Sequence, residues 1–190
     1  GHALAENGKK VLIVDLDPQC NLTIISMEEE ELHNIWKEED PFIDSFDDAK
    51  KAMTENDFKH FMSKPKTIHY LLKPTEEGTA DHSQLPPPKN LSSNLDLIPG
   101  RLTTYYYEDV LSKRWSEIYQ GDALAIRTIS KIRDITQAYG KQYGYDIVIL
   151  DTSPSLGILN KIIISTVDGF LVPCSPDMFS LYGIRNLGNA

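Results

Sequence analysis

The chain has 190 residues, of which 41% are hydrophobic and 25% are charged, as is usual for one globular domain with a substantial core. Its formal net charge of −9 argues against nucleic-acid binding over the whole surface of the chain, because contact with phosphates needs clustered Lys and Arg side chains. No apolar run approaches the roughly 20 residues that span a bilayer, and no secretion leader is recognisable, so we expect a cytoplasmic protein without a membrane span.

The start of the chain predicts a helix followed by a buried strand. Residues 1–7 include good helix formers, and Gly8 suits the position just after a helix, so a helix is expected to end here. The four apolar residues Val11–Val14 then predict a strand buried on both faces. A helix leading into a strand is typical of the second half of a βαβ unit, whose first strand would lie before Gly1.

The next part of the chain is acidic and is expected to be a variable region. Residues 28–66 contain several runs of Asp and Glu and predict a solvated helical insertion rather than a dedicated partner site. Its aromatic side chains give this region an apolar face; they are Trp36, Phe42, Phe46, Phe58 and Phe61. Residues 75–90 include three consecutive prolines and predict a surface loop. We therefore assign residues 28–90 as an insertion within a single domain that covers residues 1–190.

Three further apolar runs predict strands, at Leu95–Ile98, Ile147–Leu150 and Phe170–Val172. Apolar residues spaced three and four apart between Ala125 and Tyr139 predict a helix that is closed by Gly140. Strands that alternate with helices predict an α/β fold with a doubly wound, mostly parallel sheet.

Acidic side chains follow two of these predicted strands. Asp15 and Asp17 come directly after the first strand, and Asp151 follows Ile147–Leu150. In open α/β sheets, ligands bind outside the carboxyl ends of the strands, where hard carboxylate oxygens suit Mg²⁺ and its phosphate ligands. An Asp after a strand is also a common turn former or helix cap, but two such sites in one sheet favour a metal–phosphate site.

Four segments resemble, in sequence and in order, the ParA/MinD group of P-loop ATPases. "VLIVDLDPQCNLT" resembles the acidic switch that follows the first βα unit, and "YDIVILD" with the residues after it resembles a Walker B segment leading into a second switch. "NLDLIPG" and "FLVPCSPDMFSLYGIRNL" occupy the family's order. The triplet DPQ favours the ParA and Soj branch, which partitions chromosomes and plasmids. The resemblance covers residues 1–26 and 90–190 well and the acidic region poorly.

The resemblance implies a role for each matching residue. Asp15 would lie near Mg²⁺ and reach it through water, Asp17 would position the water that attacks the γ-phosphate of ATP, and Asp151 would hold a metal-bound water. Two switches would sense the nucleotide. Gln19 and Asn21 would belong to the first, and the second would run from Thr152 to Leu156, with Thr152, Ser153 and Pro154 as its nucleotide-binding residues.

The same resemblance implies a reaction and partners. The reaction would be Mg²⁺-dependent hydrolysis of ATP to ADP and phosphate, in a homodimer that sandwiches ATP. The expected partners are nonspecific DNA in the ATP state and a ParB-like centromere-binding protein. Family members usually carry Gly at the position of Cys20, which leaves the flexibility of the first switch in question. Cys20 and Cys174 are expected to be reduced thiols with structural roles.

The sequence departs from the family in one large feature, because it contains no glycine-rich Walker A loop with its lysines. Lys9 and Lys10 cannot substitute, since they precede the strand and lie ~13 Å from the acids at its other end. We therefore expect a fragment of a longer polypeptide that binds ATP poorly or not at all. A missing central strand is also expected to expose apolar sheet edges.

Three other classes of protein were weighed against this interpretation. A phosphorelay receiver domain has a similar acidic pair, but its phospho-accepting strand lies much closer in sequence than Asp151 lies to Asp15, and no Lys-Pro pair follows Phe170–Val172. A dinucleotide-binding enzyme would need a G-x-G-x-x-G motif, which is absent. A non-catalytic interaction protein on the same fold stays open, although closely placed carboxylates without a cation repel one another.

Overall fold

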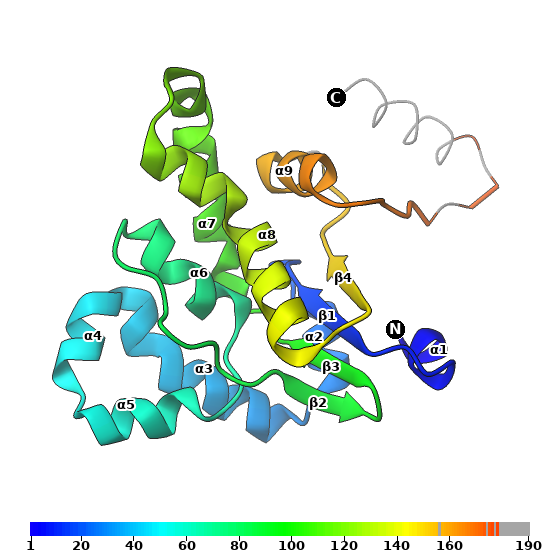
Figure 1. Ribbon diagram of the computed structural model, residues 1–190, viewed down its shortest axis with the longest axis horizontal. Coiled ribbons are helices and arrows are strands. Elements are labelled where there is room, and N and C mark those ends of the chain that lie inside the picture. Colours follow the sequence, from blue (N-terminus) through cyan, green and yellow to red (C-terminus); the bar gives the residue numbers. More distant parts are fainter. Residues whose placement is uncertain (156, 174, 177, 179–190) are drawn as a thin grey trace.

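The computed structural model describes residues 1–155, 157–173, 175, 176 and 178, and it is an assembly of helices around one small sheet (Figure 1). Along the chain its elements are α1 (His2–Glu6), β1 (Val11–Asp15), α2 (Asn21–Ser26), α3 (Glu29–Asp44), α4 (Phe46–Ala52), α5 (Glu55–Met62), α6 (Ile68–Glu76), β2 (Lys89–Ser92), β3 (Leu95–Ile98), α7 (Tyr105–Arg114), α8 (Ala123–Tyr143), β4 (Ile147–Asp151) and α9 (Ile158–Thr166). Short 3₁₀ helices cover Leu102–Thr104 and Trp115–Gln120.

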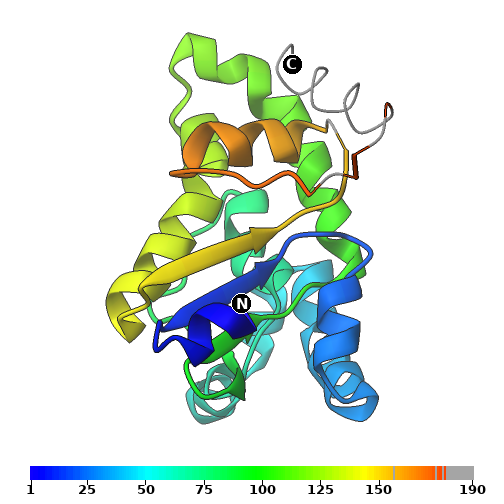
Figure 2. The same ribbon diagram turned by 90° about the vertical axis from the view of Figure 1, so that its right-hand side faces the viewer.

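The sheet confirms the predicted α/β fold with mostly parallel strands. Its order is β2-β3-β1-β4, and β1 is parallel to both of its neighbours, as Figure 2 shows for β1 and β4. The last residues of two strands face each other across this pair, because Asp15 is in register with Asp151. Strand β2 runs antiparallel to β3 and lies where a surface loop was expected, at the end of residues 75–90.

Alternate residues of β1 pack into two separate cores on the two faces of the sheet. Leu12 and Val14 belong to a large core that is built mainly from α6, α7, α8 and α9. Val11 and Ile13 belong to a smaller core beneath α1 and the start of α3. The continuous apolar run of β1 therefore reflects a strand that is covered on both sides.

Two helices were predicted from the sequence to end at a glycine, and the structure confirms one of these ends. Helix α1 ends as expected, and Gly8 adopts a positive φ of 77° just after it. The expected end of α8 at Gly140 is wrong, because the helix continues to Tyr143 and is closed by Gly144 at φ 69°. The amide of Tyr145 bonds the carbonyl of Gly140 at 3.2 Å, so the left-handed cap forms one turn later.

The acidic region contributes to the large core. Residues 28–66 form α3, α4 and α5, and the rings of Phe42 and Phe61 stack at 4.6 Å beneath Tyr70 of α6. Phe46 also reaches Tyr70, at 5.7 Å between ring centroids. This aromatic cluster packs the acidic helices against α6, while most of their acidic side chains stay outside the core.

One acidic side chain of α3 lies inside the protein and caps α6. Glu39 is fully buried, and its two oxygens accept hydrogen bonds from the amide of Thr67 at 2.7 Å and its hydroxyl at 2.5 Å. Thr67 is the N-cap of α6. Arg101 lies 3.6 Å from the same carboxylate. Burial raises the pKa of Glu39 to about 7, although the bonds from Thr67 and the charge of Arg101 oppose the rise.

Glu39 should make the stability of the fold depend on pH. Between its ordinary pKa of 4.5 and about 7, the folded chain holds a proton that the unfolded chain has lost, so the free energy of unfolding should fall as pH rises through this window. Glu39→Gln should remove that fall, as urea denaturation at a series of pH values would show. Glu38→Gln, at the half-buried neighbour, is the control and should keep it; an unchanged profile in Glu39→Gln would contradict the assignment.

The predicted strand Phe170–Val172 is wrong, since these residues form an extended segment without sheet pairing in the structure. Leu171 is 96% exposed, and β4, which ends the sheet, is half-buried along its whole length. A strand-forming segment and a strand edge are therefore both left without a pairing partner among the described residues. Of the helices that the structure describes, none has the length and apolar character needed to cross a bilayer.

Candidate functional site

The three predicted acids meet at the carboxyl edge of β1 and β4. Asp15 and Asp151 end the two strands opposite each other, and the amide of Leu16 donates to the carbonyl of Asp151 at 2.8 Å. Asp17 follows one residue later. Burial raises the pKa of Asp151, and the negative charge of Asp17 nearby raises it further. The structure therefore gathers on one edge the charges that the sequence placed at separate strand ends.

Asp15 is the fully buried member of the three, and its oxygens are occupied by the protein itself. One oxygen accepts from the amide of Asp17 at 3.2 Å, and the other accepts from the amide and the hydroxyl of Thr23 at 2.9 and 2.6 Å. Burial raises the pKa of Asp15, while the bonds from Thr23 oppose the rise and the charge of Asp151 adds to it. These contacts make Asp15 an anchor for the first turn of α2.

Gly100 completes this anchor from the end of β3. Its amide donates to the hydroxyl of Thr23 at 2.7 Å, and its carbonyl accepts from the indole of Trp36 at 3.1 Å. A Cβ atom on Gly100 would lie 3.0 Å from the carboxyl carbon of Asp15 and 3.1 Å from the sulfur of Cys20. Sequence reasoning missed Thr23 and treated Gly100 only as a strand terminator, because their contact spans 77 positions.

The predicted first switch forms a tight turn between β1 and α2. The amide of Gln19 donates to the carboxylate of Asp17 at 3.0 Å, and the exposed side chains of Gln19 and Asn21 bond each other at 3.2 Å. Cys20 lies in the left-handed region at φ 55°, which glycine adopts without cost, so the turn needs the conformation that a Gly here would supply. Burial and the charges of Asp15 and Asp17 raise the pKa of the Cys20 thiol to about 12, which leaves it neutral and structural.

The predicted second switch follows β4. Thr152 and Ser153 are half-buried and Pro154 is exposed. The amide nitrogen of Asn160, in the first turn of α9, donates to the carbonyls of Ser153 and Ser155 at 2.6 Å each. Leu156 of this switch and the distant Cys174 lie outside the described residues. Sequence reasoning did not identify Asn160, since an Asn within an apolar helix gives no signal of what it contacts.

The oxygens available to a cation belong to Asp17 and Asp151. Among the described residues, no group of three or more His, Cys, Asp or Glu side chains is arranged to hold a metal ion by itself. Asp17 uses one oxygen on the amide of Gln19, and the Asp151 carboxylate bonds no described side chain or amide. One or two carboxylates, completed by waters and substrate phosphates, are what Mg²⁺ ordinarily uses. The donor set therefore fits Mg²⁺ that arrives with a phosphate ligand.

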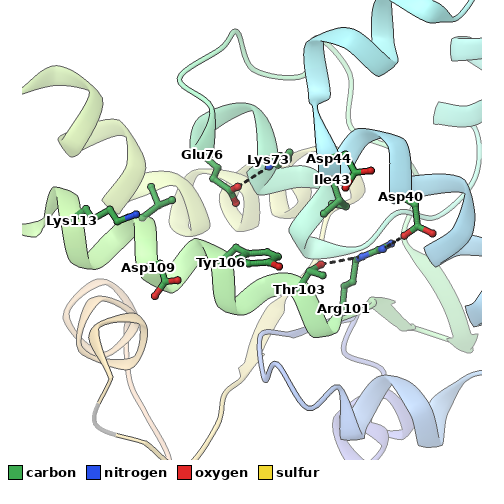
Figure 3. Close-up of a pocket in the computed structure, with 11 residues that line it drawn as sticks. Asp40, Ile43, Asp44, Lys73, Glu76, Arg101, Thr103, Tyr106, Asp109 and Lys113 are labelled. Carbon is green, nitrogen blue, oxygen red and sulfur yellow. Dashed lines mark hydrogen bonds and ion pairs between the residues drawn. The ribbon is translucent and has the colours of Figure 1, made fainter.

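A pocket of about 500 Å³ lies on the other side of the Gly100–Arg101 peptide, between α3, α6 and α7. Figure 3 shows Arg101 reaching Asp40 at one end, Lys73 bonding Glu76 above the ring of Tyr106, and Asp109 and Lys113 at the opposite end. Four of the charged side chains that line the pocket are thus paired within the protein. The carboxyl edge is separate from this pocket, which contains none of the predicted site residues.

Comparison with known proteins places the chain among nucleotide-dependent families. The whole chain, residues 1–190, matches the family described as AAA domain. It is 30% identical over 174 residues to a probable plasmid-partitioning protein ParA from Thermus thermophilus, a match that covers 91% of this chain and 38% of the relative.

Solved structures show the same fold. Protein DIP2308 from Corynebacterium diphtheriae matches with a TM-score of 0.75 and 26% identity, over 99% of this chain and 57% of that one. Cobyrinic acid a,c-diamide synthase from Mycobacterium smegmatis, with a bound ATP analog and magnesium, matches with a TM-score of 0.58 and 21% identity, over 100% of this chain and 59% of that one. The chain thus spans little more than half the length of these proteins, and less of the Thermus relative.

Proposed function

The chain belongs to the family of ParA-type P-loop ATPases, and from this premise we propose that its carboxyl-edge site hydrolyses ATP to ADP and phosphate during plasmid or chromosome partition. The observation that carries the proposal is the meeting of Asp15, Asp17 and Asp151 at one edge of a parallel sheet. Such an edge is where α/β sheets bind their ligands.

Each acid has its own role in this proposal. Asp17 keeps one oxygen free beside the edge, so it positions and polarises the attacking water. Asp151 would help to hold Mg²⁺, which would supply charge stabilisation to the phosphate oxygens. Asp15, whose oxygens are occupied by Thr23 and Asp17, acts near the metal by holding the first switch in place.

The loops on either side sense the nucleotide. Gln19 and Asn21 present exposed polar side chains in the first switch. Thr152, Ser153 and Pro154 continue from Asp151 in the second switch. Both loops begin at the carboxyl edge, so a phosphate bound there would contact both.

The phosphate cradle of the site lies, in this proposal, outside the 190 residues. They contain no glycine-rich stretch ahead of a Lys-Thr or Lys-Ser pair. The half-buried edge of β4 is the place where a strand leading into such a loop would pair. The whole polypeptide is proposed to form a homodimer around ATP, to bind DNA nonspecifically in that state, and to be stimulated by a ParB-like protein.

Nucleotide binding tests this function. Calorimetry with a non-hydrolysable ATP analogue should show Mg²⁺-dependent binding to a polypeptide that carries the glycine-rich segment ahead of Gly1, and little binding to residues 1–190 alone. The same titration with EDTA in place of Mg²⁺ is the control and should show much weaker binding. Equal binding by both polypeptides, or binding that ignores Mg²⁺, would contradict the proposal.

A further inference from the structure

The buried side chain of Asn160 contacts the loop that follows Asp151, the proposed Walker B acid. It is 7% exposed, and its amide nitrogen donates to two main-chain carbonyls, of Ser153 and Ser155, at 2.6 Å each. The amide of Ser155 also donates to the carbonyl of Ser153 at 2.8 Å. Two carbonyls that converge on one buried donor fix the direction of the peptides between them.

The other end of the same side chain is unsatisfied. Among the buried side-chain nitrogens and oxygens of the described residues, the carbonyl oxygen of Asn160 is the one atom without a hydrogen-bond partner. A buried acceptor without a partner is unfavourable, because it has lost its bond to water. The two bonds of the amide nitrogen are therefore what keeps the side chain in this orientation.

Glu108 of α7 lies close to the end of the same loop. An added Cβ on Gly157, the residue before α9, would lie 2.0 Å from the carboxylate oxygen of Glu108, so the glycine lets this flexible side chain approach the loop. Helix α9 has no side-chain cap, and a carboxylate near its first turn is electrostatically favourable. The amide of Gly157 donates to the hydroxyl of Ser155 at 3.3 Å, so the residue beside Glu108 bonds a residue that Asn160 also bonds.

We propose that Asn160 is a positioning residue for the hydrolysis proposed above, because its amide sets the course of the main chain that leaves Asp151. The inference rests on that function. Asp151 is separated from Ser153 by Thr152 alone, so a loop freed from Asn160 would let the acid and its metal-bound water move relative to Asp17. Misplacement by about 1 Å is enough to slow a positioned reaction about a hundredfold.

Two substitutions separate this role from simple packing. Asn160→Asp keeps the shape but replaces the donor by a second acceptor that faces two carbonyls. Asn160→Leu removes the donor together with the unsatisfied oxygen and keeps the number of side-chain heavy atoms, so it tests the loss of the two bonds without adding a second acceptor. The matched control is Asn7→Leu, because Asn7 also donates to a main-chain carbonyl, of Ala3 at 2.6 Å, but is exposed and far from the site.

Hydrogen exchange on residues 1–190 measures how firmly the loop after Asp151 is held. The amides of Ser155 and Gly157 should exchange about tenfold faster in both Asn160 variants, while the amides in the last turn of α9 and the Asn7→Leu control stay at wild-type rates. Wild-type exchange at Ser155 and Gly157 in both variants would overturn the proposal.

Kinetic measurements on the polypeptide with the phosphate-binding segment test the effect of Asn160 on hydrolysis. Both Asn160 variants should lower kcat about a hundredfold with the dissociation constant of the Mg²⁺–nucleotide complex unchanged. Turnover at the wild-type rate would overturn the positioning role. A wild-type polypeptide that hydrolyses nothing would overturn the proposed function instead, and the exchange rates would then show whether Asn160 fixes the loop.

Discussion

Asp17→Ala in the polypeptide with the phosphate-binding segment is expected to retain ATP binding and to lose hydrolysis by about 10²–10⁴-fold. Asp17 has one carboxylate oxygen engaged by the amide of Gln19 and the other free at the carboxyl edge. The free oxygen is suited to orient a water, which matters in the transition state and little in the bound ground state. Single-turnover release of phosphate, beside a binding titration, measures both quantities.

A second variant separates chemistry from the local fold. Asp17→Asn retains an oxygen that can accept from Gln19, so it should preserve the turn and still lose hydrolysis, because the negative charge is gone. Asp47→Ala is the matched control, since Asp47 is an exposed acid of α4 outside the site. Normal turnover in Asp17→Asn and Asp17→Ala would remove the role given to this residue.

Arg101→Ala is expected to destabilise the fold by about 3 kcal/mol. Arg101 is 7% exposed, and it donates to the carbonyl of Trp36 at 2.6 Å and to the hydroxyl of Thr103 at 3.0 Å. It also pairs with Asp40 and lies 3.6 Å from the buried Glu39. Its removal leaves the Trp36 carbonyl without its donor and takes a positive charge away from the buried Glu39 carboxylate, which is more costly than the loss of a surface ion pair.

Urea denaturation measures this effect through the midpoint at an unchanged slope. Arg133→Ala is the control, because Arg133 is an exposed residue of α8, and it should remain within about 0.5 kcal/mol of the wild type. A similarly small effect for Arg101→Ala would show that the network around Glu39 adds little to stability.

The position of Arg101 connects stability to the site. It follows Gly100 directly, and Gly100 contacts Thr23, whose bonds hold Asp15. On its other side, Arg101 forms part of the pocket shown in Figure 3 and is fixed to α3 through Trp36. The acidic region, which the sequence resemblance covers poorly, is thus connected to the carboxyl edge by the hydrogen bonds of Gly100 and Arg101.

The sequence predicted the parts of this fold that depend on local patterns. Apolar runs identified β1, β3 and β4, continuous in β1 and β4 and interrupted by Asp96 in β3, and the acid after β1 and after β4 located the site edge. Strand β2 was missed because "KNLS" is polar and pairs only as an antiparallel edge. Phe170–Val172 has the apolar pattern of a strand but pairs with no strand in the described part of the chain, since pairing depends on neighbours and not on pattern alone.

The contacts that shape the site could not be predicted from local sequence patterns. Thr23 and Gly100 meet across 77 positions, and the two bonds of Asn160 depend on the path of a turn. The helix end at Gly144 rather than Gly140 also depended on tertiary packing, because Tyr139 is buried and Tyr143 packs against the same core.

A crystal structure of the polypeptide that carries the glycine-rich segment, with Mg²⁺ and a non-hydrolysable ATP analogue, would show whether the nucleotide binds at the carboxyl edge. We expect the terminal phosphate at the carboxyl edge, facing Asp17 and Asp151, with the preceding strand paired to β4. A nucleotide seated instead in the pocket beside Arg101 and Tyr106, or any site that leaves both acids facing solvent, would contradict the account.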